Sequence, residues 1–273
     1  MRTRTALLTL GGAAVIIAGA ACALPQIAPP ITKHHAQAQE RATSTLPVSN
    51  AAAPGGRFDL SDWELQLPTG SPGSPTTISP ARLVGTGGYA NARYFSLGDN
   101  GAMTFWAPEK GVTTPHSDYA RSELRQMNPD GSLAEWRITE NHTLSATVAI
   151  PNVTKRVCVG QVHLGTGGPS TKVLTELYYG ADGQIMLGVA KSPDGGQVEH
   201  PLGRVPLGQR WTYSITVDDQ VLRVSINGQT STYPIPHSFD PYSVYFKAGS
   251  YNQSSSENST RGARVEFFAL GLS

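Results

Sequence analysis

The chain has 273 residues, of which only 15% are charged, and it contains 29 Gly and 20 Pro. This length allows one large domain or two small ones, and the Gly and Pro content suits a β protein with many turns. The first 56 residues hold four of the 21 basic and one of the 20 acidic residues, which leaves 17 and 19 for the remainder, a formal net charge of −2. That balance excludes a global attraction for polyanions and disfavours nucleic acid as a partner, so a polyanion would need a local basic patch.

Residues 1–23 have the pattern of a secretory signal peptide. Two arginines among the first four residues precede an apolar run that ends near the small-residue triplet Ala21-Cys22-Ala23. This order predicts cleavage and a secreted, extracellular protein that does not stay at the membrane. Two alternatives remain open: an uncleaved membrane anchor, because the run is nearly long enough to span a bilayer, and a lipid attached at the cysteine of the triplet.

Residues 24–56 are rich in Pro, Ala, Gln and Ser and show no apolar periodicity. Such a segment cannot bury enough surface to offset its ordering entropy, so we expect a disordered linker. The pair His34-His35 within it is no more than a weak candidate for a metal site. Removal of the signal would leave Cys158 as the only cysteine, which excludes a disulfide framework or a cysteine-based zinc site. We expect one monomeric domain over residues 57–273.

The start of this domain already shows strand periodicity. Trp63, Leu65 and Leu67 alternate with other residues, as in a half-buried strand. Residues 70–75 form a turn cluster. Residues 79–83 give the one convincing helical signal, since a Ser at the cap position is followed by Pro at the first helical position.

Many short strands are expected after that point. We predict them at residues 102–106, 122–127, 133–139, 143–150, 156–164, 172–179, 184–190, 211–217, 221–226, 242–251 and 263–272. Asp182-Gly183 and Asn227-Gly228 are strong hairpin turns. The absence of a βαβ alternation and of a repeat period predicts an all-β fold, a jelly-roll sandwich of two antiparallel sheets.

Two of the predicted strands carry polar residues in a row. In the first, Arg121, Glu123 and Arg125 share a face, and such spaced guanidinium groups are suited to bidentate binding of carboxylates. The alternative is a solvated strand face with internal ion pairs. In the second, Gln161 and His163 share a face. The opposite face of that strand would carry Cys158, Gly160, Val162 and Leu164, which assigns Cys158 a packing role in the core.

A third strand carries the longest polar row. Tyr245, Lys247, Tyr251 and Gln253 share one face, with Gly249 leaving room between them. The residues between them are apolar or small and suit a buried face. Each polar residue alone could be an ordinary surface residue, but the whole row is typical of the floor of a polar cleft.

The three rows exclude several kinds of chemistry. They contain no free pair of carboxylates, no Gly-x-Ser-x-Gly nucleophile motif and no second histidine at metal-ligand spacing. We therefore expect no metal and no cofactor. The remaining histidines of the domain are scattered, and the sequence indicates no function for them: His116, His142, His200 and His237.

Cations, an amide, an imidazole and a phenol suit the removal of a proton beside a carboxylate. The C5 hydrogen of a uronate is weakly acidic because its neighbouring carboxylate is already anionic. Arg121 and Gln161 can stabilise the dianion that develops. His163 can act as a neutral base near pH 7, while Tyr251 acts as the acid or, with a lowered pKa, as the base. The chain is then cut without water, leaving a C4–C5 double bond.

These rows resemble a known family. The segments RSELR (121–125), QVH (161–163) and YFKAGSYNQ (245–253) are similar to the sequence blocks of polysaccharide lyase family seven, the alginate lyases, and the resemblance extends over about 57–273. It implies a jelly roll with a substrate cleft on the concave sheet, and catalysis without a metal. An acidic polysaccharide, alginate or a related polyuronate, would be the partner.

The resemblance also implies roles for individual residues. Arg121 and Gln161 would neutralise the carboxylate, His163 would be the base for guluronate, and Tyr251 would be the acid, or both acid and base for mannuronate. The residues that would hold neighbouring sugars are Glu123, Arg125, Tyr245, Lys247 and Gln253. In this family the middle residue of the second block is Ile or Val, and Val162 resembles the form associated with mannuronate-rich substrate, although it would face the core.

Three alternatives remain: a lyase that acts on another polyuronate, and two proteins of other classes. Glucuronan, a 1,4-linked polymer, has the same acidic C5 hydrogen. A non-catalytic module that binds acidic glycans would need the cationic rows but not both His163 and Tyr251. A glycoside hydrolase on a similar sandwich would need two free carboxylates. The joint presence of the imidazole and the phenol favours the enzyme, which we expect to be an endo-acting lyase that leaves 4,5-unsaturated oligosaccharides.

Overall fold

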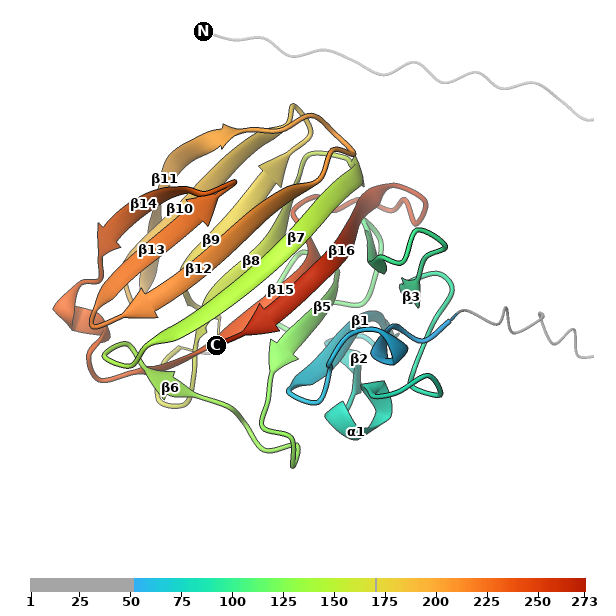
Figure 1. Cartoon of the computed structure of the whole chain (residues 1–273), viewed down its shortest axis with the longest axis horizontal. Helices are drawn as coiled ribbons and strands as arrows, with labels where there is room; N and C mark the ends of the chain where they lie inside the picture. Colours follow the sequence, from blue (N-terminus) through green and yellow to red (C-terminus); the bar gives the residue numbers. More distant parts are fainter. Residues whose placement is uncertain (1–51, 170) are drawn as a thin grey trace, which may run out of the picture. The chain divides into compact units, whose positions relative to one another are not determined.

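The computed structural model describes residues 52–169 and 171–273, which form two antiparallel β-sheets stacked face to face (Figure 1). The predicted signal and most of the predicted linker lie outside the described residues. Strands make up most of the domain, and the sandwich is a jelly roll, as the strand pattern predicted. Among the described residues no helix is long and apolar enough to cross a membrane.

The first sheet has nine strands in the order β11-β10-β9-β8-β15-β5-β1-β2, with β6 paired to β15. Three consecutive neighbours in its middle, β8, β15 and β5, are the strands that carry the polar rows. The bounds are β1 Trp63–Ser71, β2 Ser74–Ile78, β5 Arg121–Gln126, β6 Trp136–Arg137, β8 Arg156–Leu164, β9 Val173–Gly180, β10 Gln184–Ser192, β11 Gly195–Arg204 and β15 Ser243–Asn252.

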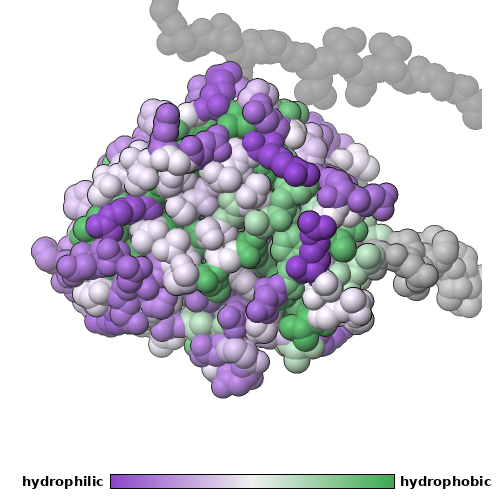
Figure 2. Space-filling model, in the orientation of Figure 1, coloured by the Kyte–Doolittle hydropathy of each residue, from purple (hydrophilic) through white to green (hydrophobic). Residues whose placement is uncertain are grey.

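The second sheet has seven strands in the order β14-β13-β12-β7-β16-β4-β3. Their bounds are β3 Phe95–Leu97, β4 Met103–Pro108, β7 His142–Val153, β12 Trp211–Asp218, β13 Val221–Ile226, β14 Gln229–Pro234 and β16 Gly262–Leu272. Figure 2 views the molecule from the side of this sheet, where strongly hydrophilic residues gather at the margins and residues of intermediate hydropathy occupy the middle.

The core lies between the two sheets and consists of the apolar residues that alternate along the strands. Trp63, Leu65 and Leu67 of β1 are all buried, which confirms the alternation seen at the start of the domain. Val162 of β8 is fully buried in this core, on the face of the sheet opposite to the polar rows. The burial of one face of each strand fixes its register, since a slip by one residue would turn the polar row into the core.

The structure confirms the predicted helix and corrects two other predictions, the end of the linker and the strand at 133–139. The linker prediction reached too far, because Ala52 bridges Leu97 and a 3₁₀ turn, η1 (Pro54–Gly56), packs against the domain. The helix α1 (Pro80–Leu83) forms where it was expected, and a second 3₁₀ turn, η2, spans His237–Phe239. The strand expected at 133–139 is reduced to the two residues of β6.

Candidate active site

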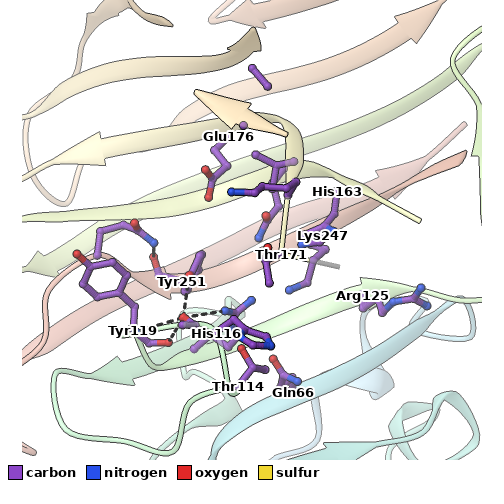
Figure 3. A pocket seen from close by; sticks show the side chains of 18 of the residues that line it. Gln66, Thr114, His116, Tyr119, Arg125, His163, Thr171, Glu176, Lys247 and Tyr251 are labelled. Carbon is purple, nitrogen blue, oxygen red and sulfur yellow. Dashed lines mark hydrogen bonds between the residues drawn. The ribbon is translucent and has the colours of Figure 1, made fainter. Parts of the chain in front are cut away.

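A pocket of about 600 Å³ opens on the outer face of the nine-stranded sheet. Residues from β1 on one side to β11 on the other line it. Figure 3 shows Glu176 and His163 on the side opposite to Gln66 and Thr114. All of the predicted site residues line the pocket except Glu123: Arg121, Arg125, Gln161, His163, Tyr245, Lys247, Tyr251 and Gln253.

The register of the three central strands explains why the polar rows meet. Lys247 of β15 lies opposite Arg125 of β5 on one side and opposite Gln161 of β8 on the other, while Tyr251 lies opposite Arg121. Side chains at directly opposite positions point to the same face and lie about 5 Å apart. Three segments far apart in the sequence thus form one continuous polar surface.

Glu123 is the exception, and its predicted contact with substrate is wrong. Its side chain is completely buried beneath the pocket floor. One carboxylate oxygen is 2.6 Å from the ammonium of Lys247 and 3.5 Å from Arg121, and the other accepts a hydrogen bond of 2.6 Å from Gln161. Burial alone would raise the pKa of Glu123, but the charges of Lys247 and Arg121 outweigh it and hold the pKa below its ordinary value. Glu123 therefore orients three residues that face the pocket.

The close approach of β15 to β5 at this point requires a glycine. Gly249 lies opposite Glu123 with φ of +151°, and a Cβ there would lie 2.7 Å from the Cα of Glu123. That conformation and that distance are open only to glycine.

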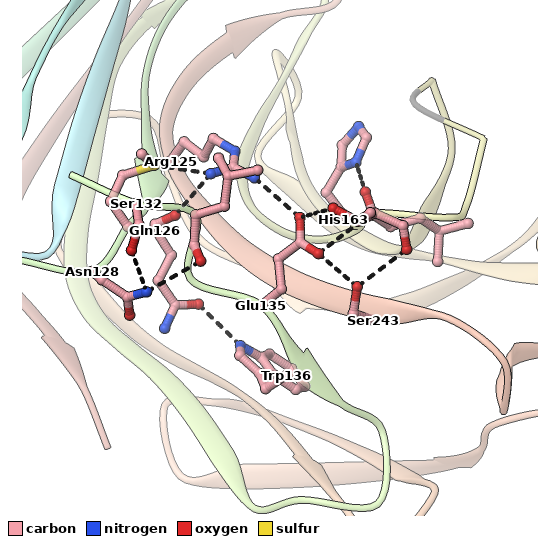
Figure 4. A network of polar contacts seen from close by, with 12 residues as sticks. Arg125, Gln126, Asn128, Ser132, Glu135, Trp136, His163 and Ser243 are labelled. Atoms are coloured by element: carbon pink, nitrogen blue, oxygen red, sulfur yellow. Dashed lines mark hydrogen bonds and ion pairs between the residues drawn. The ribbon is translucent and has the colours of Figure 1, made fainter. Parts of the chain in front are cut away.

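His163 is held in one tautomer. Its Nδ1 is 2.9 Å from the carbonyl oxygen of Leu164, which can only accept, so Nδ1 carries the proton and Nε2 has a free lone pair (Figure 4). The ring stacks on Tyr245 at 5.2 Å between centroids. Burial and then the positive charge of Lys247 lower the pKa of His163 to about 4. The imidazole is therefore neutral near pH 7 and can accept a proton at Nε2.

Tyr251 is in contact with a cation and a hydroxyl. The guanidinium carbon of Arg121 lies 3.9 Å from the centroid of the phenol ring, and the phenol oxygen is 3.0 Å from Oγ of Ser117. Burial raises the pKa of Tyr251, and Arg121 together with the hydrogen bond to Ser117 opposes the rise. The phenol is therefore protonated at neutral pH and has neighbours that can stabilise its anion.

Arg125 is fixed at the edge of the pocket by the network in Figure 4. Its guanidinium lies 3.5 Å from Glu135 and 4.0 Å from the ring centroid of Tyr245. Glu135 also accepts hydrogen bonds from the backbone of Thr166 at 2.8 Å and from Ser243 at 2.7 Å. This carboxylate thus connects the arginine of β5 to the loop after β8 and to the first residue of β15.

Cys158 is buried, but it does not face the core as predicted. It lies opposite Tyr178 of β9 and Tyr251 of β15, whose side chains are on the pocket side, and the pairing of β8 shifts register between Cys158 and Gly160. A Cβ on Gly160 would lie 2.9 Å from the hydroxyl of Tyr213 in the core. The bulge therefore turns Cys158 toward the pocket side while Gly160 keeps the core face.

Several residues that line the pocket were not predicted. The loop before β5 contributes Ser117, Tyr119 and also His116, for which the sequence indicated no function. This loop has no periodicity that could reveal which side chains point inward. Glu176 of β9 could have been found by the same alternation that revealed the other rows.

Glu176 adds a carboxylate to the pocket. It is 9% exposed, and one of its oxygens accepts hydrogen bonds of 2.6 Å from both Tyr178 and Gln197. Burial raises its pKa, and these two hydrogen bonds oppose the rise. The described part of the chain contains no group of three or more His, Cys, Asp and Glu residues that could hold a metal ion.

The geometry brings together a cation–amide pair, a neutral imidazole and a phenol on one polar surface. Arg121 and Gln161 can bind a carboxylate, since both present donors to the pocket. His163 offers a lone pair, and Tyr251 offers a proton. Such a set can remove a proton next to a bound carboxylate and protonate a leaving oxygen.

Comparison with known proteins gives a consistent result. A family model described as alginate lyase matches residues 58–273. The chain is 34% identical to alginate lyase A1-II′, a member of polysaccharide lyase family 7, with a TM-score of 0.72 over 82% of this chain and 98% of that one. An alginate lyase from Pseudomonas aeruginosa is also 34% identical, with a TM-score of 0.71 over 79% of this chain and 99% of that one.

A curated alginate lyase from Klebsiella pneumoniae is 26% identical over 276 residues, which cover 80% of this chain and 90% of that protein. Variants of A1-II′ have been solved in complex with the product GGG and with the substrate GGMG.

Proposed function

The chain belongs to the alginate lyase family, polysaccharide lyase family seven, and we propose how it acts. It is a polysaccharide lyase that acts on alginate. We propose that it is a secreted enzyme that cleaves within the polymer by β-elimination and leaves 4,5-unsaturated oligosaccharides. The observation that carries this proposal is the free Nε2 of His163 in the same pocket as the phenol of Tyr251 and the cation–amide pair.

The first step is the neutralisation of the uronate carboxylate. Arg121 and Gln161 are both anchored by Glu123, so their donors are held in place before substrate arrives. Donors that need no reorganisation stabilise a developing dianion most effectively. We expect Gln161→Ala to lower kcat by about 10²–10³-fold, the usual effect of losing one such donor.

The second step is the transfer of two protons. On guluronate, His163 Nε2 takes the C5 proton while Tyr251 gives its proton to O4, the C4–O4 bond breaks and the C4–C5 double bond forms. On mannuronate the reaction starts from the phenolate of Tyr251, which Arg121 and Ser117 favour. The phenolate takes the C5 proton, and the phenol so formed gives the same proton to O4 as the C4–O4 bond breaks and the C4–C5 double bond forms. The low pKa of His163 supports its role as a base that is already neutral at pH 7.

The width of the pocket supports cleavage within the polymer. It extends from Glu64 of β1 to Gln197 of β11, across seven neighbouring strands. At about 4.8 Å between strands, this is roughly 29 Å. Arg125, Lys247, Tyr245 and Gln253 line the same surface and would hold the carboxylates and hydroxyls of neighbouring sugars.

The proposed preference is for mannuronate-rich alginate. It rests on Val162, whose side chain is buried in the core and can act only by moving Gln161 and His163 on either side of it. Glucuronan is the alternative substrate, because its C5 hydrogen has the same chemistry.

The test is a panel of mannuronan, guluronan, mixed alginate and glucuronan, with the increase in ultraviolet absorbance as the readout and sizing of the products. We expect the fastest increase with mannuronan and a mixture of oligosaccharide lengths from the start. Release of only monomer or dimer from the outset contradicts the endo action, and a faster increase with guluronan or glucuronan contradicts the preference.

A matched pair of variants tests the role of the phenol. Tyr251→Phe should abolish turnover and spare binding of the polymer, whereas Tyr242→Phe, outside the pocket, should leave both unchanged. Near-normal turnover by Tyr251→Phe contradicts its assignment as the acid. Secretion is tested separately by the mass of the protein exported from an expressing cell, which should lack residues 1–23.

A further inference from the structure

The hydroxyl of Ser117 sits between the phenol of Tyr251 and the guanidinium of Arg121. Its Oγ is 3.0 Å from the phenol oxygen and accepts a hydrogen bond of 3.2 Å from Arg121. It also donates to the backbone carbonyl of Tyr119 at 3.1 Å and accepts from the backbone N–H of the same residue at 3.2 Å. A single side chain on the loop before β5 thus connects both residues that the proposed mechanism uses at this end of the pocket.

Ser117 Oγ can donate its one proton either to the carbonyl of Tyr119 or to the phenol oxygen of Tyr251. A serine hydroxyl has one proton to donate. While that proton is on the carbonyl of Tyr119, the phenol of Tyr251 is the donor in the 3.0 Å contact, and it shares the two lone pairs of the serine oxygen with Arg121 and the backbone N–H of Tyr119. Once Tyr251 has lost its proton, only Ser117 can donate in that contact, and a rotation about its Cβ–Oγ bond is enough to do so.

We propose that Ser117 is a positioning residue that holds Tyr251 in both of its protonation states, by turning its hydroxyl proton between the carbonyl of Tyr119 and the phenolate. This inference rests on the proposed function, in which Tyr251 loses and regains a proton in every turnover. On guluronate the O–H bond of Tyr251 breaks, its proton goes to O4, and the C5 proton goes to His163. The proton taken up by His163 returns to Tyr251 after the product leaves, so the enzyme is unchanged.

The surroundings of the phenol explain why such a partner is needed. Burial disfavours the phenolate, and the carboxylates Glu123 and Glu176 disfavour it as well, while Arg121 favours it. The other titratable groups on the surfaces that meet here are His116 and Tyr119 of the loop and the thiol of Cys158 beneath. The hydroxyl of Ser117 is neutral and can accept a hydrogen bond from the phenol or donate one to the phenolate, so it can stabilise Tyr251 in both protonation states.

The variants Ser117→Ala and Ser117→Thr separate this role from a structural one. The loss of a hydrogen bond to an ionised group should lower kcat of Ser117→Ala on mannuronan by about ten- to a hundredfold, with KM changed only a few-fold. The pH limb that belongs to Tyr251 should move up by about one unit. Ser117→Thr keeps a hydroxyl and should restore most of kcat and the position of the limb.

A titration that needs no turnover completes the test. The difference in phenolate absorbance between the wild type and Tyr251→Phe reports the pKa of Tyr251 alone, and the same difference in the Ser117→Ala background should give a higher pKa. An unchanged pKa, or a threonine variant that is folded and as slow as the alanine variant, overturns the proposal. If the wild type cleaves none of the polyuronates, the proposed function fails, and the titration still decides whether Ser117 stabilises the phenolate.

Discussion

Replacement of Glu123 by Gln should destabilise the domain more than any exchange of a surface charge. The side chain of Glu123 is 0% exposed and that of Lys247 is 7% exposed, and their charged atoms are 2.6 Å apart. Glutamine has nearly the same size, so the change removes the charge and leaves the packing almost intact. The change also replaces one carboxylate oxygen by an NH₂ group, which cannot accept the hydrogen bonds that Lys247 and Gln161 donate to the two oxygens of Glu123.

The loss of unfolding free energy in Glu123→Gln depends on Lys247, whose buried ammonium no longer has a counter-charge. Breaking a buried ion pair by removing one partner costs about 3–5 kcal/mol, because the remaining charge is desolvated and has no counter-charge. For a domain of this size about 2–4 °C of melting temperature correspond to 1 kcal/mol. Glu123→Gln should therefore melt about 6–20 °C below the wild type.

The assay is unfolding by heat and by urea, with an exposed ion pair as the matched control. Lys110 and Glu257 are 2.7 Å apart, but their side chains are 58% and 92% exposed. Such exposed pairs contribute little to stability, so Glu257→Gln should unfold almost like the wild type. Turnover should fall in Glu123→Gln as well, because Gln161 loses the acceptor that orients it.

Two results would refute this reasoning. One is a Glu123→Gln variant no less stable than Glu257→Gln. The other is a double variant, Glu123→Gln with Lys247→Met, no more stable than Glu123→Gln alone, since removal of the stranded ammonium should recover part of the loss. The low pKa of Glu123 adds a pH dependence: its contribution is present above the unfolded pKa near 4.5 and is lost as the pH falls through the lower folded pKa, so the difference between wild type and variant should shrink in acid.

Further predictions concern three other residues. With a pKa of about 4 for His163, kcat/KM on guluronan should keep its acidic limb near pH 4. The same shift means that stability falls as the pH drops from about 6.5 toward 4, a loss that His163→Asn should lack in urea titrations. Gly249→Ala should cost about 2–4 kcal/mol in urea unfolding, because its Cβ would meet the backbone of β5 at 2.7 Å, whereas Gly271→Ala, with no neighbour closer than 3.4 Å, should not. Glu109→Gln should lose about 1–3 kcal/mol and speed proteolysis of the loop at 254–261, which this buried carboxylate holds through two serines and an arginine.

The strands that the sequence failed to predict share one position in the fold. They are β2, β3, β11 and β14, which lie at the four ends of the two sheets. An edge strand often buries neither face completely, and it tolerates Pro because one row of its N–H groups has no partner. β11 and β14 both contain Pro and expose most of their residues. Alternation could therefore reveal the inner strands, which bury one face, and not these.

In the candidate site, too, residues on regular strands could be predicted, whereas residues at a bulge or on a loop could not. The rows on β5, β8 and β15 could be predicted because alternation alone decides which side chains share a face. Cys158 was assigned to the wrong face, because a bulge shifts the register and no residue type marks it. His116 and Ser117 were missed because they lie on a loop, where direction depends on contacts distant in sequence. Glu123 was assigned to the correct face, but alternation cannot show that Lys247, Arg121 and Gln161 bind its carboxylate and leave it 0% exposed.

The buried carboxylate explains how a domain with a slightly negative net charge can bind a polyanion at one place. Arg121 and Lys247 lie close together and largely out of water, where two like charges would favour loss of the ammonium proton. Glu123 beneath them compensates for this repulsion and favours the charged state of Lys247. The cationic surface in turn helps to keep His163 neutral. One side chain that no substrate can touch therefore sets the charge of the groups that bind the carboxylate and supports the neutral state of the group that takes the proton.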